Sequence, residues 1–346
     1  MNEPSRWMLY GPYGTTGRLI LDEALRRGHR PLLAGRDEAR LSALAGATGL
    51  QALPLRVDSP QPDGAALKGV AAVLNAAGPF FQTGAPLRKL CLEAGVSYVD
   101  VSGEIEDFVA AMGCDAEARA RRVAIIPGAG FGVVFGEALA AHVARRLPDA
   151  TWLKLSIAAV NALTSRGATR STGAVLAGGG YAVSDGRLVR RPMAFTTWRL
   201  APQNDGSAAR RFAAAPRAEL VAAHRLTGIK EIVAGVPLSL TGAIVMRIAG
   251  RFVGALLSRS NAGGKPVTDA ARADLRSYIW AEAGNRAGKR VLSVLETGEG
   301  YQLAAAAAVS AVEKLLAERP VGSLSPAQAF GIDFALSLPG TRIKDL

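Results

Sequence analysis

Short apolar runs alternate with segments of helical periodicity from the start of the chain to about residue 130. The runs are apolar along their whole length, which is typical of strands in a parallel sheet covered on both faces. This alternation predicts an α/β domain with a doubly wound parallel sheet. The predicted strands are Trp7–Tyr10, Pro31–Ala34, Leu50–Val57, Val70–Leu74, Ser97–Val101 and Ala124–Gly128. The predicted helices lie between them, one ending at Arg27 and others over Glu38–Leu44, Pro86–Ala94 and Ile105–Arg122.

The pattern changes after about residue 150, where strand signals dominate and helices are fewer. We expect an inserted α+β domain here, for substrate binding or dimerisation. It is expected to span residues 131–299, and the first domain residues 1–130 plus about 300–346, with a helix over Leu303–Leu316. The other predicted elements are a strand over Trp152–Val160, a helix over Gly167–Ala177, a glycine-rich turn or hairpin over Gly178–Arg187, a β-like segment over Val189–Leu200, a loop over Gln203–Ala208 and a final strand with its turn over Gly284–Glu296.

An uncharged run from Ile232 to Met246 is followed by Arg247, Arg251 and a further apolar stretch, Val253–Leu257. The uncharged run is shorter than the roughly 20 residues that span a bilayer. We therefore expect an apolar helical segment over 232–257 that does not cross a membrane. Three roles for this segment stay open. It could be a buried or dimer-facing helix, it could line a site for an acyl chain, or it could make a peripheral membrane contact with the arginines at its polar edge.

Composition narrows the choice of partners. The 346-residue chain has a formal net charge of +12, and 49% of its residues are hydrophobic, as in an ordered globular protein. Eight of the 41 basic residues are lysines, and the arginines are scattered in pairs without interleaved aromatic residues. We therefore expect no nucleic-acid partner. A basic surface suits anionic ligands such as a phosphorylated cofactor, a coenzyme A thioester, an acyl carrier protein or an anionic membrane.

The two cysteines, Cys91 and Cys114, lack the spacing of a metal site and are too few for a disulfide framework. We expect no metal. The first residues lead directly into the strand at Trp7, which leaves no room for a signal peptide. We expect the cytoplasm as the compartment, with membrane association as the alternative.

A glycine-rich loop connects the first strand to the first helix. Gly11, Gly14 and Gly17 are each separated by two residues. Such a loop turns sharply, lets backbone N–H groups approach a pyrophosphate, and brings the helix close to the sheet. The helix N-terminus then adds partial positive charge. A glycine triplet alone is a weak signal, but the strand before it and the helix and strand after it predict a dinucleotide site.

The residue after the second strand indicates which dinucleotide binds. Enzymes that use NAD place Asp or Glu here to accept bonds from the ribose. This chain has Arg36, whose planar guanidinium suits a 2′-phosphate, and Asp37, which we expect to cap the next helix. The sequence therefore favours NADP(H) over NAD(H). The expected cofactor contacts lie in the glycine loop and at the later strand ends: Gly11, Tyr13, Gly14, Thr15, Thr16, Gly17, Arg36, Asp58, Ala76, Ala77, Gly78, Pro79, Ser102 and Gly103.

The string of motifs resembles the saccharopine dehydrogenase-like family, in the short branch that includes the trans-acting enoyl reductases. The resemblance extends over nearly the whole chain. The most specific parts are Ala77-Gly78-Pro79-Phe80 with Thr83-Gly84, and Tyr98-Val99-Asp100-Val101-Ser102-Gly103-Glu104. Relatives have an aromatic residue where this chain has Thr15. The other matching segments are 10–19, 34–36, 73–76, 85–87, 91–95, 127–131, 298–301 and 324–327.

The resemblance implies a nicotinamide-dependent oxidoreductase with a Rossmann domain and an inserted substrate domain, and we expect a homodimer. Three hypotheses about its reaction stay open. The first is an NADPH-dependent reductase of an activated C=C bond in a hydrophobic, lipid- or polyketide-type substrate, which a carrier protein or coenzyme A would present as a thioester. The second is a C=N reductase with Arg166, Arg170 or Arg225 holding substrate carboxylates. The third is a non-catalytic NADP-binding protein that docks on a membrane or partner.

The candidates for the proton donor are Glu104, His224 and Tyr301. Glu104 follows a strand end near the expected nicotinamide, and His224 is a titratable group in the second domain. Tyr301 lies at a strand-to-helix turn. Structural roles compete with these: Asp100 would bind backbone N–H groups, Glu104 would cap the helix after it, and His224 would be a surface side chain with satisfied hydrogen bonds.

Overall fold

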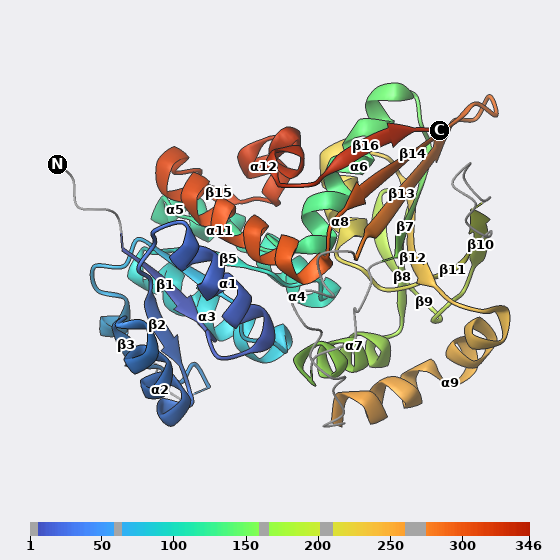
Figure 1. Cartoon of the computed structure of the whole chain (residues 1–346). Helices are drawn as coiled ribbons and strands as arrows, with labels where there is room; N and C mark the ends of the chain where they lie inside the picture. Colours follow the sequence, from blue (N-terminus) through green and yellow to red (C-terminus); the bar gives the residue numbers. More distant parts are fainter. Residues whose placement is uncertain (1–5, 59–63, 159–165, 201–209, 260–274) are drawn as a thin grey trace. The chain divides into compact units, whose positions relative to one another are not determined.

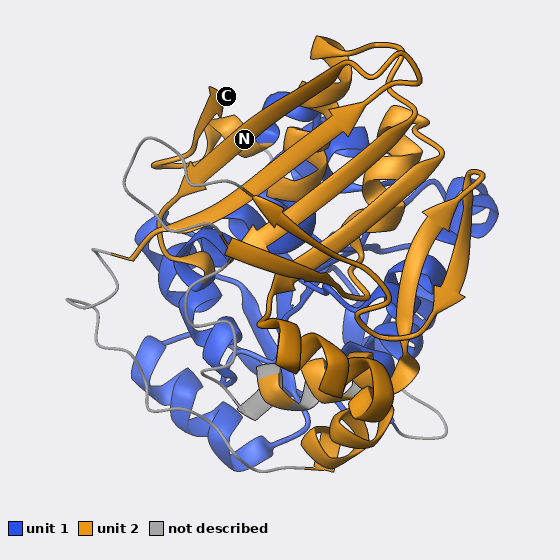
Figure 2. Cartoon of the chain, turned by 90° about the vertical axis from the view of Figure 1, so that its right-hand side faces the viewer, with its two compact units in different colours: residues 1–134, 301–334 blue, residues 135–300, 335–346 orange. Residues whose placement is uncertain are grey.

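The computed structural model describes residues 6–58, 64–158, 166–200, 210–259 and 275–346. The chain divides into two compact units (Figure 2). Unit 1 comprises residues 1–134 and 301–334, and unit 2 comprises residues 135–300 and 335–346.

Unit 1 is built on a parallel sheet of seven described strands in the order β15-β6-β5-β4-β1-β2-β3 (Figure 1). Most of its inner strands are buried along their full length, because helices cover both faces of such a sheet. The strands are β1 (Trp7–Tyr10), β2 (Leu32–Gly35), β3 (Ala52–Pro54), β4 (Ala72–Asn75), β5 (Ser97–Asp100), β6 (Ala124–Ile126) and β15 (Gly322–Ser323). The helices are α1 (Thr15–Arg26), α2 (Glu38–Thr48), η1 (Gly64–Leu67), α3 (Phe80–Ala94), α4 (Ile105–Met112), α5 (Asp115–Arg121), α11 (Gly300–Glu318), α12 (Pro326–Phe330) and η2 (Ile332–Ser337), with α11 and η2 each reaching the boundary of unit 2.

The expected doubly wound parallel sheet is confirmed, with two local corrections. The single helix predicted over Ile105–Arg122 is wrong, because α4 ends at Met112 and α5 starts at Asp115. Helix α3 starts at Phe80, six residues before the predicted Pro86. Its first turn is stabilised by a carboxylate from a distant part of the chain, which local sequence does not reveal.

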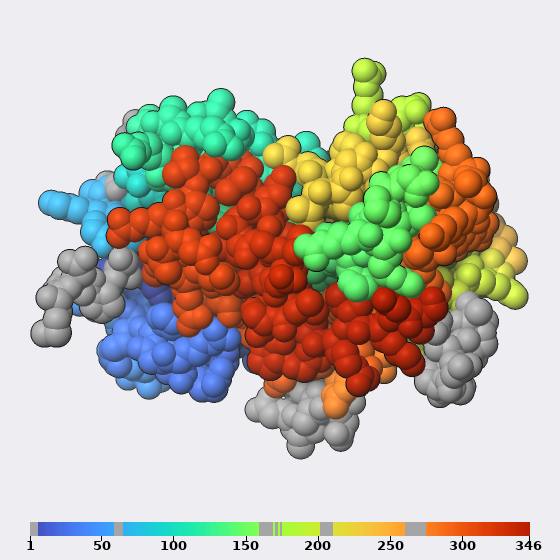
Figure 3. Space-filling view, turned by 90° about the horizontal axis from the view of Figure 1, so that it is seen from above, coloured from blue at the N-terminus to red at the C-terminus, as the bar shows by residue number. Residues whose placement is uncertain are grey.

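Helix α11 lies alongside α1, although the two are far apart in sequence (Figures 1 and 3). The Arg27 guanidinium donates to Glu313 at 2.9 Å and to the Ser310 hydroxyl at 2.8 Å. The His29 ring nitrogen lies 2.8 Å from the same Glu313 carboxylate. These contacts attach the C-terminal helix to unit 1, as expected for Leu303–Leu316.

Unit 2 is built on a mixed sheet (Figure 2) whose main path runs β10-β11-β12-β7-β13-β14-β16. Strand β7 pairs parallel with β12 and antiparallel with β13. Its strands are β7 (Trp152–Ala158), β8 (Gly180–Ser184), β9 (Arg187–Arg191), β10 (Thr197–Leu200), β11 (Arg210–Ala214), β12 (Glu231–Pro237), β13 (Ser277–Gly284), β14 (Arg290–Thr297) and β16 (Arg342–Asp345). Its helices are α6 (Phe131–Arg146), which starts in unit 1, α7 (Arg166–Gly178), α8 (Glu219–Thr227) and α9 (Leu240–Arg259).

The glycine-rich hairpin predicted in this unit is confirmed as β8–β9. Its turn places Asp185 and Gly186 at φ 50° and 74°, the left-handed pair that a two-residue hairpin requires. The predicted strand over Gly284–Glu296 is only the second arm of a hairpin, since β13 precedes it. The loop predicted over Gln203–Ala208 lies outside the described residues.

Two expectations about longer segments are wrong. Residues 335–346 belong to unit 2, because β16 pairs antiparallel with β14 there. Residues 232–257 are not one helical segment: strand β12 ends at Pro237, and helix α9 starts at Leu240. Proline at the end of the strand separates the two elements.

Candidate functional site

Two glycines of the loop between β1 and α1 occupy positions where a side chain would collide with neighbouring atoms. Gly11 has φ 84°, and a Cβ there would lie 2.7 Å from that of Ala77. A Cβ on Gly17 would overlap the carbonyl oxygen of Gly11. Gly14 differs, since a Cβ there would lie 3.6 Å from that same carbonyl oxygen, an ordinary van der Waals distance. The outer glycines are therefore required by the fold, and Gly14 keeps the backbone open to a ligand.

Helix α1 starts directly after this loop, with Gly14 as its N-cap. Among the described residues, no side chain caps it and no acidic residue lies in its first turn, which contains Thr15 and Thr16. The first amides of a helix carry partial positive charge and lack intrahelical partners. This end of α1 therefore fits a pyrophosphate.

Tyr13 shapes the loop after β2. Its phenol oxygen accepts the backbone N–H of Arg36 at 3.0 Å and that of Asp37 at 3.2 Å. A Cβ on Gly35 would lie 2.7 Å from this oxygen, so the tyrosine requires glycine at the end of β2. We expected cofactor contact at Tyr13 beside the pyrophosphate, but the ring packs at the end of β2.

Arg40 joins this group, although it was not among the residues predicted from the sequence. Its guanidinium lies 4.9 Å from the centre of the Tyr13 ring and donates to the Tyr13 carbonyl at 3.0 Å. Asp37 accepts the Arg40 N–H at 3.1 Å and caps α2, as predicted. Arg36 and Arg40 are both exposed at the carboxyl end of β2. In the sequence, the four-residue spacing between Arg36 and Arg40 was the signal that could have identified Arg40.

The loop after β4 is held by Asn75. Its side-chain oxygen accepts the Ala77 N–H at 3.0 Å, and its amide donates to the Tyr98 hydroxyl at 3.0 Å. The Thr83 hydroxyl donates to the Ala77 carbonyl at 2.6 Å. These bonds fix the predicted contact residues of this loop at the carboxyl edge, where Ala76 and Pro79 are buried and Gly78 is exposed.

Glu104 has a structural role in this site. Its two carboxylate oxygens accept the backbone N–H groups of Phe80 and Phe81, each at 2.9 Å. It therefore caps α3, not the helix that follows it as expected. A side chain that is 4% exposed and bound to two amides is a poor proton donor. Ser102 is likewise buried, with its hydroxyl accepting the Glu104 N–H at 3.1 Å, whereas Gly103 is exposed.

A buried charged cluster lies beneath these loops. Asp100 accepts the N–H groups of Ser102 at 2.9 Å and Gly128 at 2.8 Å, which confirms its predicted structural role. Arg88 binds Asp107 at 2.8 Å and lies 3.9 Å from the second oxygen of Asp100. Burial, together with the neighbouring Asp107, raises the pKa of Asp100 to about 7.

The remaining predicted residues lie elsewhere. Asp58 follows β3 and is exposed, 3.3 Å from the Arg56 guanidinium, which holds the pKa of its carboxyl below the usual value. Tyr301 is half-buried in the first turn of α11. His224 is half-buried on α8, with Nδ1 2.8 Å from the Ile229 carbonyl. The side chains of Arg166 and Arg170 lie outside the described residues, and Arg225 is exposed.

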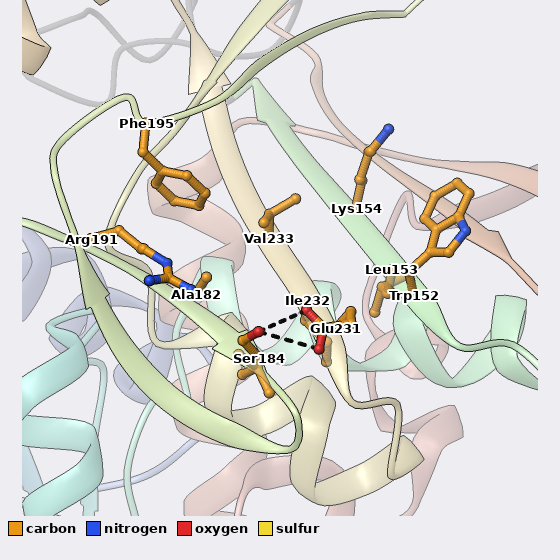
Figure 4. Close-up of a pocket in the computed structure, with 11 residues that line it drawn as sticks. Trp152, Leu153, Lys154, Ala182, Ser184, Arg191, Phe195, Glu231, Ile232 and Val233 are labelled. Atoms are coloured by element: carbon orange, nitrogen blue, oxygen red, sulfur yellow. Dashed lines mark hydrogen bonds between the residues drawn. The ribbon is translucent and has the colours of Figure 1, made fainter.

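A shallow hollow of about 220 Å³ lies on the sheet of unit 2 (Figure 4). Phe195 and Val233 give it apolar walls. The Glu231 carboxylate at its edge accepts the Ser184 hydroxyl at 3.0 Å and the Asp185 N–H at 2.6 Å. Because the Glu231 carboxylate is engaged in holding the hairpin turn, it is not available as an acid in the hollow. The hollow offers a ligand apolar contacts from Phe195 and Val233.

Residues 7–124 match the family described as the saccharopine dehydrogenase NADP binding domain. The predicted resemblance is confirmed. The matched segment contains the glycine loop, Arg36 and the Asn75 and Glu104 strand ends. The match therefore identifies residues 7–124 as similar to an NADP-binding domain of the saccharopine dehydrogenase type.

Two curated relatives are similar over a shorter stretch. Trans-acting enoyl reductases of Mycobacterium tuberculosis (strain H37Rv) and Mycobacterium bovis (strain BCG) are 34% identical over 107 residues. The match covers 28% of this chain and about a quarter of the length of each relative. Apo saccharopine dehydrogenase (L-Glu forming) from Saccharomyces cerevisiae matches 99% of this chain and 100% of its own, with a TM-score of 0.63 at 12% identity. This last match shows the fold.

Proposed function

We propose that the protein is an NADPH-dependent reductase that transfers a hydride to an activated C=C bond of a hydrophobic substrate. The observation that carries the reaction type is the 34% identity to trans-acting enoyl reductases over 107 residues. The coarser function, an NADP-binding oxidoreductase, rests on the domain match over residues 7–124.

The arginine pair after β2 supports the choice of cofactor. Arg36 and Arg40 offer two guanidinium groups where an NAD-specific protein needs a carboxylate. Guanidinium groups bind phosphate oxygens through charge-assisted hydrogen bonds. The adjacent Asp37 carboxylate already accepts the backbone N–H of Arg40, as the cap of α2. We therefore assign the 2′-phosphate to this pair and the pyrophosphate to the start of α1.

The sheet of unit 2 supports a hydrophobic substrate. Phe212 lies 6.3 Å from Trp198 and 5.7 Å from Trp280, and Tyr278 stacks at 5.6 Å on Trp280. Phe195 and Val233 pack on the same cluster and also line the hollow. Phe212 and Trp198 are buried in this cluster, so an acyl chain would contact Phe195 and Val233 at its surface.

NADPH, when bound, would supply a hydride for the β-carbon of the enoyl group, and a group of the protein would deliver a proton to the α-carbon. The product therefore gains two hydrogen atoms and the cofactor is oxidised. With Glu104 engaged as a helix cap, His224 and Tyr301 remain as the candidates for delivering the proton.

The test measures NADPH oxidation with enoyl coenzyme A thioesters of increasing chain length and with the same acyl groups on a carrier protein. We expect turnover that rises with chain length and a product two mass units heavier. Gly14→Ala is the matched inactive control, because this change leaves the loop room to fold but blocks the pyrophosphate. Turnover only with an imine would instead assign a C=N reductase. Tight NADPH binding without turnover of either class would assign the non-catalytic role.

A further inference from the structure

Helix α9 presents its large apolar side chains to solvent. Ile248, Phe252 and Leu256 are 82%, 75% and 66% exposed. Leu240 and Ile244 continue the same row at four-residue intervals, each about half exposed. Side chains four apart share one side of a helix, so these residues form a continuous apolar face. We call residues 240, 244, 248, 252 and 256 the outer face of α9.

The fully buried positions of α9 lie on its opposite side and are small residues. Ala243, Gly250 and Gly254 are its buried positions. A Cβ on Gly254 would overlap backbone atoms of α7, and a Cβ on Gly173 of α7 would overlap backbone atoms of α9. Figure 1 shows the two helices lying along each other. The helix thus packs through glycines and leaves its bulky apolar residues outside, the reverse of a soluble amphipathic helix.

The charges of α9 favour an anionic partner. Its charged residues are all arginines: Arg247, Arg251 and Arg259. All three are exposed, and Arg247 donates to the Phe195 carbonyl at 3.2 Å. The whole chain carries a net charge of +12. Two copies packed through α9 would bring arginines together without a carboxylate on either helix, whereas an anionic bilayer would complement them.

We propose that α9 is a monotopic membrane-binding helix that lies in the plane of an anionic bilayer. Its outer face enters the boundary between headgroups and acyl chains, and its arginines contact lipid phosphates. Although its 20 residues are long and apolar enough to cross a membrane, the glycine side stays packed on α7. A spanning arrangement would place Arg247 and Arg251 near the bilayer centre, which is strongly unfavourable.

The experiment is flotation of the full chain with phosphatidylcholine vesicles, with and without about one-third phosphatidylglycerol, at low and high salt. We expect flotation with the anionic vesicles that weakens at high salt. The double variant Ile248→Ser with Phe252→Ser should lower the partition coefficient at least tenfold. Arg251→Gln with Arg259→Gln should lower it severalfold and remove the preference for anionic lipid.

Val109→Ser is the matched control, since Val109 is an exposed apolar residue on α4 and should leave flotation unchanged. Melting curves of each variant report folding independently of lipid. A wild-type chain that stays unbound with both kinds of vesicle overturns the proposal. If the wild-type chain is also a dimer, and the double variant Ile248→Ser with Phe252→Ser is a monomer, then a second copy covers the outer face. Salt-resistant binding would indicate a spanning helix. No substrate is present, so the outcome is independent of the proposed reductase activity.

Discussion

The phenol oxygen of Tyr13 accepts the backbone N–H of Arg36 at 3.0 Å. This bond links the glycine loop after β1 to the loop after β2, the two segments that would bind the two ends of the adenosine diphosphate. Because the same oxygen also accepts the Asp37 N–H, one side chain sets the backbone at the proposed 2′-phosphate site.

Tyr13→Phe should therefore weaken NADPH binding without unfolding unit 1. The ring is retained, but two backbone N–H groups lose their acceptor, a loss of about 1 kcal/mol for each neutral hydrogen bond. We expect a dissociation constant for NADPH raised by roughly five- to thirtyfold in a fluorescence titration. Tyr278→Phe, in the sheet of unit 2, is the control. An unchanged affinity in Tyr13→Phe would mean that the loop keeps its shape without the bond.

Arg36→Ala should reduce affinity for NADPH about 10- to 100-fold and leave that for NADH nearly unchanged. The reason is that a charge-assisted bond to phosphate contributes about 1.5–3 kcal/mol, and only NADPH has the 2′-phosphate. Arg40→Ala should act in the same direction and also loosen Tyr13. The measurement is the ratio of the two dissociation constants, with Arg30→Ala as the control. Equal losses for both cofactors would contradict the assignment.

The glycines of the first loop should separate into two kinds. Gly17→Ala places a Cβ against the Gly11 carbonyl and should lower the melting temperature. Gly14→Ala has room in the fold and should keep the melting temperature within about 2 °C while weakening NADPH binding at least tenfold. Thermal melting and cofactor titration of both variants check this. Tight NADPH binding by Gly14→Ala would place the pyrophosphate elsewhere.

Glu104→Gln should destabilise the protein without changing the pH profile of turnover. The substitution removes the negative charge at the start of α3 and leaves one of two backbone N–H groups without its carboxylate acceptor. We expect a loss of about 1–3 kcal/mol in the free energy of unfolding. A large fall in kcat with an altered pH profile, at unchanged stability, would return Glu104 to the role of proton donor.

Asp100 should make stability depend on pH. Its pKa is raised from 3.8 to about 7, so the folded chain holds this proton more tightly than the unfolded chain. The contribution to stability is present at low pH and is lost as pH rises from about 4 to about 7, at about 1.4 kcal/mol per pH unit at most. Urea unfolding of Asp100→Asn should give a shallower decline than the wild type. The exposed Asp22→Asn should match the wild type, and a matching slope in Asp100→Asn would refute the assignment.

The sequence by itself determined the dinucleotide-binding unit, because its signals are local. The strand at Trp7–Tyr10, the glycine spacing from Gly11 to Gly17 and the cap at Asp37 each depend on neighbouring residues. The hairpin turn at Asp185 and Gly186 was predictable for the same reason. Arg36 indicated the cofactor through its place at the end of the second strand.

Only the tertiary structure decided the roles of residues that act across the chain. Glu104 caps a helix that begins 24 residues before it, and Arg40 reaches Tyr13 from 27 residues away. Hydrophobic periodicity shows that α9 has an apolar side, but it does not reveal which side packs. Close approach to α7 requires glycine, so the small residues face the protein and the large ones face out. The tail after residue 335 joins the second sheet for a similar reason, because strand pairing depends on free edges that no local pattern records.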